Sequence, residues 1–409
     1  MATSTSAPAT HPLKAADASA LDALIDLAHP RKVAAASWAA RILGTPCATF
    51  DRERWEAAAQ FGIQGLTVPG HLGGAGLSMV DAMLTFEGLG LGAIDQGTVF
   101  ALSAQVFSMQ SALLAAGSPA QQARWLPDLC HGRAIGAFAM SEPEAGSDTS
   151  SIRTRATRLP DGRYQLDGVK AWVTLGTVCD VLIVFATTDP ALGGWGVTAF
   201  LLSATRPGIT AAPEIAKFGL ESCPFTTLTF TSCLAEPDEV LGAPGAGAAV
   251  FRDAVNAERA FLYAAQLGAT ERTIERTIAR ARDRTQFGQP IGHFQAVSHR
   301  IADMKLRHEA ARLLVYKAAL LHDLGQDVTM AAALAKLQTS ETAVDSALDA
   351  MRIFGAEGFT LAAGLDRGLR DAVGGLSYSG TSDIQRNIVA RLLGLERPQR
   401  PGPISAPKD

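Results

Sequence analysis

The sequence has no marked excess of either charge and no block of basic residues. Its 36 Lys and Arg stand against 40 Asp and Glu, which gives a formal net charge of −4 over 409 residues. Binding to nucleic acid needs clustered cations that neutralise phosphates, and no Lys/Arg-rich run is present. Nucleic acid is therefore not an expected partner.

Cysteine is scarce, and histidine shows no metal-binding pattern. The five cysteines are Cys47, Cys130, Cys179, Cys223 and Cys233. An odd number without a CxxC pair indicates neither a disulfide framework nor a zinc site, and it suits a reducing cytoplasm. The eight histidines lack HExxH spacing, and His308 is expected on the surface of a helix. No metal is predicted.

Long hydrophobic runs are absent as well. No stretch of about 18 uninterrupted apolar residues occurs, so no membrane span is expected. Residues 1–16 are small and polar and lack the apolar core of a signal peptide, so we expect a flexible leader. Hydrophobic residues nevertheless make up 47% of the chain and charged residues 19%, which suits a large buried core.

The hydrophobic pattern divides the chain into three parts. From residue 17 to 133 apolar residues recur at helical spacing between turn clusters. Residues 134–240 contain short β-rich stretches such as VLIVFATTD and GVTAFLLSA, which predict a small β-sandwich or barrel. Long helical segments return over residues 241–396 and favour an antiparallel four-helix bundle, with a flexible tail at 397–409. We therefore predict an α+β multidomain chain.

One glycine-rich stretch resembles a nucleotide-binding motif only superficially. The sequence GLGLG, Gly88 to Gly92, ends a helix-like segment instead of following a strand. Because a dinucleotide-binding loop needs a preceding strand, we interpret it as a helix-terminating turn.

Two segments near the start of the β part carry possible cofactor contacts. The first is AMSEPEAGSDTSS, Ala139 to Ser151, where hydroxyls, a proline, a glycine and backbone amides offer a nest for phosphate oxygens. The second is DGVKAWVTLG, Asp167 to Gly176, in which Trp172 lies close to the hydroxyl of Thr174. Alone, the first is more often a simple turn and the second a core strand.

Together, the two segments resemble the acyl-CoA dehydrogenase family, whose patterns TEPxAGSD and GxKxWITNG line FAD. The resemblance implies an FAD enzyme with the helical, β and helical domains of that family. It also implies that the isoalloxazine meets Met140, Ser141, Trp172 and Thr174. Gly146 and Ser147 are then expected near the dinucleotide or the substrate entrance.

Further family segments follow in order toward the C-terminus. RTQFGQPIGHFQ, Arg284 to Gln295, resembles RxQFGxPIxxFQ, whose Arg reaches the FAD of a neighbouring subunit; FGAEGF and YSGTSDIQR resemble later cofactor segments. The cofactor residues that these segments imply are Arg284, Gln286, Phe287, Gln295, Arg352, Gly355, Thr381 and Asp383. The chain departs from the family at Arg352, Ala356 and Asp383, where Gln, Gly and Gln or Glu are common.

The reaction that the resemblance implies needs a base near the α-carbon of an acyl thioester. Ser379 stands where many relatives carry an acid, and a serine cannot act as that base alone. On the helix opening the last domain, Glu258 lies in an apolar stripe with Phe251, Val255 and Leu262. A lone acid there more often pairs with an Arg of another helix.

The resemblance favours Glu258 as the catalytic base instead. In the isovaleryl-type and long-chain-type branches the base resembles the Glu of such an ER pair, with a small residue at the C-terminal position. Tyr378, Ser379 and Gly380 are then expected to line the active site, where the Ser379 N–H helps to polarise the thioester oxygen.

The function expected from these residues is α,β-dehydrogenation of a saturated acyl thioester to its 2-enoyl form. The substrate would be an acyl-CoA or an acyl-carrier protein, and the electron acceptor an electron-transfer flavoprotein or oxygen. The resemblance also implies a homodimer or homotetramer. Two alternatives remain open: a flavin monooxygenase or oxidase on the same fold, and a catalytically silent flavin-binding protein.

Overall fold

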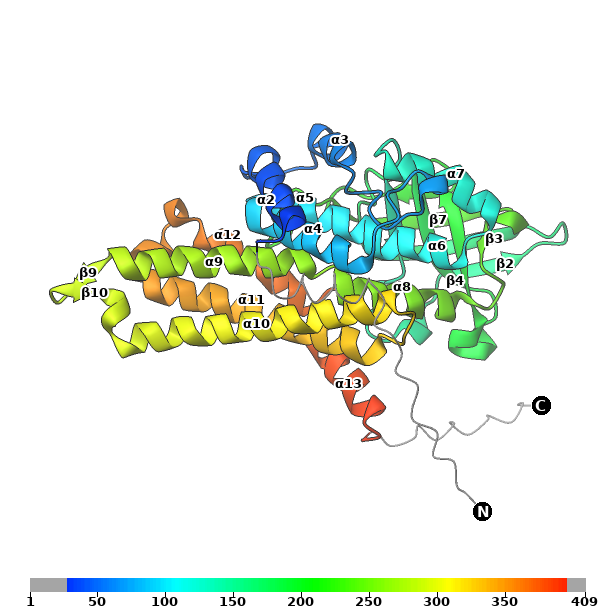
Figure 1. The fold of residues 1–409 in the computed structure, drawn as a ribbon. Coiled ribbons are helices and arrows are strands. Elements are labelled where there is room, and N and C mark those ends of the chain that lie inside the picture. The colour runs from blue at the N-terminus through cyan, green and yellow to red at the C-terminus, as the bar shows by residue number, and fades with distance from the viewer. Residues whose placement is uncertain (1–27, 396–409) are drawn as a thin grey trace, which may run out of the picture.

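The computed structural model describes residues 28–395, so the predicted leader, tail and first part of the helical domain lie outside the described residues. In Figure 1 the N-terminal helices lie along one side of the molecule, the sheet lies at one end, and the long C-terminal helices extend to the other end. The first part contains α2 (Pro30–Ile42), α3 (Arg52–Phe61), η1 (Gly70–Leu72), α4 (Met79–Gly92), α5 (Gln96–Ala104), η2 (Gln105–Gln110), α6 (Ser111–Ala116) and α7 (Pro119–Cys130).

Side chains cap several of these helices where the sequence changes from turn to helix. Ser78 accepts a hydrogen bond from the backbone of Asp81 at the start of α4, and Ser118 and Gln121 form a reciprocal capping box at α7. The segment Gln96–Ala116 is long and apolar enough to cross a membrane by length and composition, but 67% of its apolar window is buried inside the protein. Such burial is typical of a core helix.

The GLGLG glycines have a packing role. Gly88 and Gly90 lie inside α4, where a Cβ on Gly90 would stand 1.7 Å from the Ala265 carbonyl oxygen of α9 (Ala264–Asp283). A Cβ on Gly88 would stand 2.3 Å from the Lys32 carbonyl oxygen of α2. The predicted helix-terminating turn is wrong at these two positions, because the glycines instead let three helices approach closely.

The middle part is a mixed sheet of eight strands. They are β1 (Gly136–Ala139), β2 (Arg155–Arg158), β3 (Tyr164–Thr174), β4 (Val181–Thr187), β5 (Val197–Ser203), β6 (Ile209–Ala211), β7 (Phe225–Ala235) and β8 (Val240–Leu241). The order is β6-β7-β3-β2-β4-β5-β8, with β1 parallel to β4. Only the pair Arg155 and Thr187 joins β2 to β4, and one apolar cluster contains residues of both halves, so the halves share a core as in a sandwich.

The last part is helical. It comprises α8 (Gly247–Phe261), α9 (Ala264–Asp283), β9 (Thr285–Gln286), β10 (Gln289–Pro290), η6 (Ile291–His293), α10 (Gln295–Asp323), α11 (Thr329–Phe354), η7 (Gly355–Phe359), η8 (Leu361–Ala363), α12 (Leu365–Val373), η9 (Gly374–Leu376) and α13 (Ser382–Leu392). Helices α9, α10 and α11 run outward together, and the β9–β10 hairpin stands at their far end (Figure 1). We call this outer end, residues 276–310 and 345–363, the arm. The predicted fold class is confirmed.

His308 differs from the prediction. Its ring is buried on α10, and Nε2 lies 3.2 Å from the Leu267 carbonyl oxygen of α9. The expected surface position is wrong, because this face of α10 packs against α9 and α4.

Candidate active site

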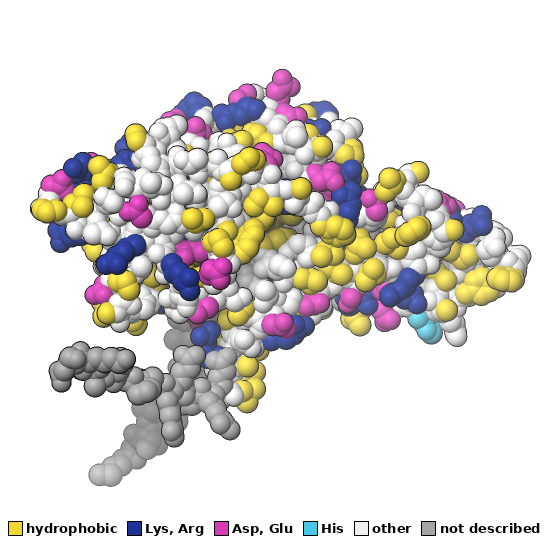
Figure 2. Space-filling model, turned by 180° about the vertical axis from the view of Figure 1, so that it is seen from behind, with side chains coloured by type: hydrophobic (Ala, Val, Ile, Leu, Met, Phe, Trp, Pro, Cys, Tyr) yellow, Lys and Arg dark blue, Asp and Glu magenta, His cyan; other side chains and the backbone are white. Residues whose placement is uncertain are grey.

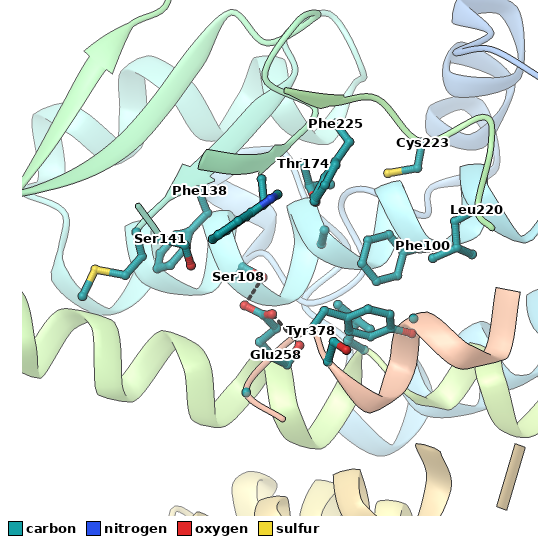
Figure 3. A pocket seen from close by; sticks show the side chains of 18 of the residues that line it. Phe100, Ser108, Phe138, Ser141, Thr174, Leu220, Cys223, Phe225, Glu258 and Tyr378 are labelled. Carbon is teal, nitrogen blue, oxygen red and sulfur yellow. Dashed lines mark hydrogen bonds between the residues drawn. The ribbon is translucent and has the colours of Figure 1, made fainter. Parts of the chain in front are cut away.

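A cavity of about 710 Å³ lies where the three parts meet. The predicted residues that line it are Met140, Ser141, Gly146, Ser147, Trp172, Thr174, Glu258, Tyr378, Ser379, Gly380 and Thr381. Figure 3 shows Glu258 at the lower edge of the cavity, with Ser141 and Phe138 to its left and Phe100, Leu220 and Tyr378 to its right. The structure thus brings residues from four distant segments to one cavity.

Glu258 projects from α8 into this cavity. Phe251, Val255 and Leu262, the apolar residues of the predicted stripe, also line the cavity. Glu258 Oε2 accepts a hydrogen bond from Ser108 Oγ at 2.8 Å, and Oε1 accepts one from Ser379 Oγ at 2.5 Å (Figure 3). Within residues 28–395 Glu258 makes no ion pair, so the carboxylate faces the cavity with two hydroxyl groups as its partners.

Sequence reasoning missed Ser108. It lies in η2, a π-helical segment between α5 and α6, and π-helical turns are frequent at functional sites. A signal was present in the sequence, because QVFSMQ inserts polar residues into an otherwise apolar helix. Nothing in that pattern indicated that Ser108 would meet Glu258.

The loop that carries Ser379 has an unusual backbone. Ser379 has φ 58° and Gly380 φ 86°, and the Ser379 carbonyl accepts a hydrogen bond from Arg259 Nε at 3.0 Å. The hydroxyl of Tyr263 donates to the carbonyls of Gly375 and Tyr378 at 3.0 and 3.2 Å. The Ser379 N–H donates no hydrogen bond inside the described chain, which leaves a donor beside the base.

A buried ion pair shapes the loop after β1. Lys170 Nζ donates to Glu142 Oε1 at 2.7 Å and to the Met140 carbonyl at 2.9 Å. Glu142 also accepts hydrogen bonds from the backbone N–H groups of Arg153 and Thr154. Burial lowers the pKa of Lys170 to about 8, although Glu142 opposes this shift. Burial alone would raise the pKa of Glu142, but Lys170 and the hydrogen bonds outweigh it and lower that pKa.

The same loop offers donors to an anionic group. Gly146, Ser147 and Asp148 are exposed, and in residues 28–395 their backbone N–H groups have no hydrogen-bond acceptor. A Cβ on Gly146 would meet nothing within 4 Å, so the loop is open on that side. Unpaired amides in a loop of this kind suit phosphate oxygens.

The wall opposite Glu258 comes from β3. Trp172 has φ 57° at an irregularity in the pairing with β7, and 48% of the residue is exposed. Thr174 lies two residues along the strand and lines the same cavity. An aromatic face, a hydroxyl and the open loop therefore fit a flavin ring with its phosphates.

The other predicted cofactor residues lie elsewhere. Arg284, Gln286 and Phe287 form the hairpin at the end of the arm, far along α9 from Glu258, and Gln295 opens α10 beside it. Phe287 has φ 53° and is 94% exposed. Arg352 lies in the last turn of α11 and Gly355 directly follows that helix, so both belong to the arm.

Arg352 and Asp383 each form ion pairs within the chain. Arg352 Nη1 lies 2.9 Å from Asp349, a carboxylate that Arg300 and Arg307 also contact. Asp383 is exposed in the first turn of α13, where it pairs with Arg386, and it does not line the cavity.

Comparison with known proteins agrees with this geometry. Family models match three segments in order: the N-terminal domain of acyl-CoA dehydrogenase at residues 31–133, the middle domain at 137–233 and the C-terminal domain at 245–394. The chain is 40% identical over 346 residues to an L-prolyl-[peptidyl-carrier protein] dehydrogenase of Pseudomonas fluorescens, covering 85% of this chain and 91% of the relative.

Solved structures give the same result. The prolyl acyl carrier protein oxidase AnaB superposes with a TM-score of 0.87 at 36% identity, covering 90% of this chain and 98% of the other. PigA with FAD and proline gives a TM-score of 0.86 at 35% identity, covering 90% and 99%.

Fold and cavity define an FAD-dependent oxidoreductase that acts on acyl thioesters. The chain belongs to the acyl-CoA dehydrogenase family. The family, the use of FAD and the dehydrogenation of acyl thioesters that were predicted from the sequence are confirmed.

Proposed function

We propose that this enzyme dehydrogenates a compact acyl group, with a prolyl group as the first choice, held as a thioester on the phosphopantetheine arm of a carrier protein. The single observation that carries the reaction is the Glu258 carboxylate, which faces the cavity that Trp172 and Thr174 also line. The acyl group and its carrier are supported by the relatives, whose names include prolyl carrier-protein dehydrogenase and oxidase.

Glu258 is the base in this proposal. Its carboxylate takes the proton from the α-carbon, while FAD, when bound, accepts the hydride from the β-carbon, so that a C=C bond forms. Ser108 and Ser379 orient the two carboxylate oxygens and leave the proton-accepting lone pairs toward the substrate. The Ser379 N–H donates to the thioester oxygen as negative charge develops there.

The cofactor residues divide between two copies of the chain. Met140, Ser141, Trp172 and Thr174, which line the cavity, would hold the flavin ring, and the N–H groups of Gly146 and Ser147 would bind the dinucleotide. The arm residues Arg284, Gln286, Phe287, Gln295, Arg352 and Gly355 serve the FAD of a neighbouring subunit, whereas Thr381 and Asp383 lie at the start of α13.

This division requires a homodimer or homotetramer. Figure 2 shows hydrophobic side chains gathered along the narrow arm. The exposed apolar residues of the arm include Phe287, Leu306, Phe359 and Leu361, each more than half exposed. Exposed apolar surface of this kind marks an interaction site, and a second copy of the chain is the proposed occupant.

The test is anaerobic reduction of bound FAD by matched thioesters. Prolyl and butanoyl groups are presented on pantetheine, on coenzyme A and on a carrier protein, and flavin absorbance is followed. The proposal expects bleaching by the prolyl carrier thioester in the parent and a loss of about 10² or more in Glu258→Gln. Bleaching by none of the thioesters would contradict it.

A second experiment with the same enzyme preparation tests the electron acceptor. Reduced enzyme is mixed either with air-saturated buffer or with an oxidised electron-transfer flavoprotein, and the rate of flavin reoxidation is measured. We propose the flavoprotein as acceptor. Rapid reoxidation by oxygen in every turnover would instead support the oxidase alternative, in line with the name of the AnaB relative.

A further inference from the structure

The active-site cavity ends at a wall with a second cavity behind it. This second cavity is about 90 Å³ and lies between α5, α9, α11 and α12. Its lining combines small residues, including Ala265, Ala269, Ala343, Ala347 and Gly368, with polar and charged ones, among them Gln266, Arg272, Arg276 and Arg367. Phe100, Leu220, Leu262, Asp371 and Tyr378 line both cavities and therefore form the partition between them.

Two aromatic rings make the centre of the partition. The ring centroids of Phe100 and Tyr378 are 4.6 Å apart at an interplanar angle of 58°. Tyr378 also stacks on Tyr263, whose hydroxyl donates to the Tyr378 carbonyl. Ring packing and a backbone hydrogen bond thus fix Tyr378 on the side away from the substrate.

Leu220 is fixed from another direction. Its backbone has φ 53°, and its N–H donates to Asp371 Oδ1 at 2.6 Å. The loop is also tightly packed, since a Cβ on Gly219 would stand 2.3 Å from the Arg370 carbonyl oxygen. The partition therefore consists of side chains from three parts of the fold, each held by its own contacts.

The partition stands at one end of the acyl path. Leu262 follows Glu258 by four residues on the same helical stripe, which is about 6 Å along the helix axis. Phe138 and Ser141 lie on the opposite side of Glu258 from Phe100 and Leu220 (Figure 3). An acyl chain that extends from Glu258 toward this side of the cavity is therefore directed at Phe100 and Leu220.

We infer that Phe100, Leu220 and Tyr378 set the upper size of the acyl group, and that the cavity behind them accepts a longer chain once the partition is opened. This inference rests on the proposed function, because it takes the acyl group to be bound beside Glu258. A compact group such as a prolyl ring or a four-carbon chain fits the closed cavity, whereas an eight-carbon chain meets the rings.

The experiment removes the partition and measures chain-length preference by binding. Phe100→Ala and Leu220→Gly each delete one side chain, and glycine suits the positive φ at position 220. S-butyl and S-octyl pantetheine thioethers, which cannot be dehydrogenated at a thioester, are titrated into the holoenzyme by calorimetry. Phe251→Ala is the matched control, because Phe251 lines the active-site cavity but not the second one.

Each buried methylene favours binding about fourfold, so the ratio of octyl to butyl affinity is expected to rise at least tenfold in both partition variants. Reduction by octanoyl relative to butanoyl pantetheine should rise with it. An unchanged ratio in both variants, or an equal rise in Phe251→Ala, would overturn the inference. If no thioester bleaches the flavin but the thioether ratio still rises, the proposed reaction fails and the partition stands.

Discussion

The cavity around Glu258 and the end of the arm differ in whether their polar and apolar side chains find partners within the same chain. In the cavity both carboxylate oxygens of Glu258 have hydrogen-bond partners, and so does the buried ammonium of Lys170 beneath the neighbouring loop. At the end of the arm Phe287 is 94% exposed, and in the described part of the chain Arg284 has no ion-pair partner. This difference is the basis for our proposals that one chain supplies the groups for proton removal and that the arm binds a second copy of the chain.

The largest effect is expected where the cavity depends on a buried charge pair. In Lys170→Met, Glu142 keeps its charge but loses its cation, and breaking a buried pair typically costs about 3–5 kcal/mol. We expect that loss in the free energy of unfolding measured with urea. The double variant Lys170→Met/Glu142→Gln should recover much of it. A single variant as stable as the parent would show that the pair does not hold the loop.

Asp371, in the partition, should make stability depend on pH. Burial raises its pKa from 3.8 to about 6. Well below pH 3.8 the carboxyl is protonated in both folded and unfolded chains, and well above pH 6 the folded protein bears the full cost of ionising it, on the order of 3 kcal/mol. Stability should thus fall from pH 4 to pH 6 in the parent.

The comparison is with Asp371→Asn, which keeps an acceptor for the Leu220 N–H. Relative to the parent, this variant should gain stability as pH rises through that window. The exposed Asp253→Asn serves as control, because Asp253 lies on the surface of α8. Parallel pH profiles for the parent and Asp371→Asn would contradict the assignment.

The arm is tested by Arg284→Ala. A charge-assisted hydrogen bond to phosphate contributes about 1.5–3 kcal/mol, so FAD should bind roughly 10- to 100-fold more weakly. Fluorescence titration of FAD measures this, with the exposed Arg252→Ala as control. If the protein runs as a monomer on sizing chromatography and keeps all its FAD, the proposal that the arm binds the FAD of a second copy is wrong.

The smallest effect is expected at Ser108. In Ser108→Ala, Glu258 loses one hydrogen bond. Such a bond contributes about 0.5–1.5 kcal/mol, so we expect a severalfold slower flavin reduction and unchanged FAD binding. Ser108→Thr retains the hydroxyl and should recover the rate. Equal rates in the alanine variant and the parent would show that Ser379 alone orients the carboxylate.

The sequence allowed the fold class, the family and the cavity residues on local motifs to be predicted. The stripe of Phe251, Val255 and Glu258 was readable because helical spacing is local. The positions of Ser108 and Leu220 were not predictable, since each reaches the cavity only through packing of parts far apart in the chain. The GLGLG glycines were misinterpreted for the same reason, because their contacts are with α2 and α9.

The most direct test of the account asks whether the base is on α8 or on the C-terminal loop. Anaerobic single-turnover reduction is measured for the parent, Glu258→Gln, Ser379→Ala and the double variant Glu258→Gln/Ser379→Glu. Because Ser379 Oγ is 2.5 Å from Glu258 Oε1, a carboxylate at position 379 reaches the same region. We predict a loss of about 10² or more in Glu258→Gln, only a severalfold slower reduction in Ser379→Ala, as in Ser108→Ala, and partial recovery in the double variant. Reduction at the parent rate in Glu258→Gln, with none in Ser379→Ala, would contradict it.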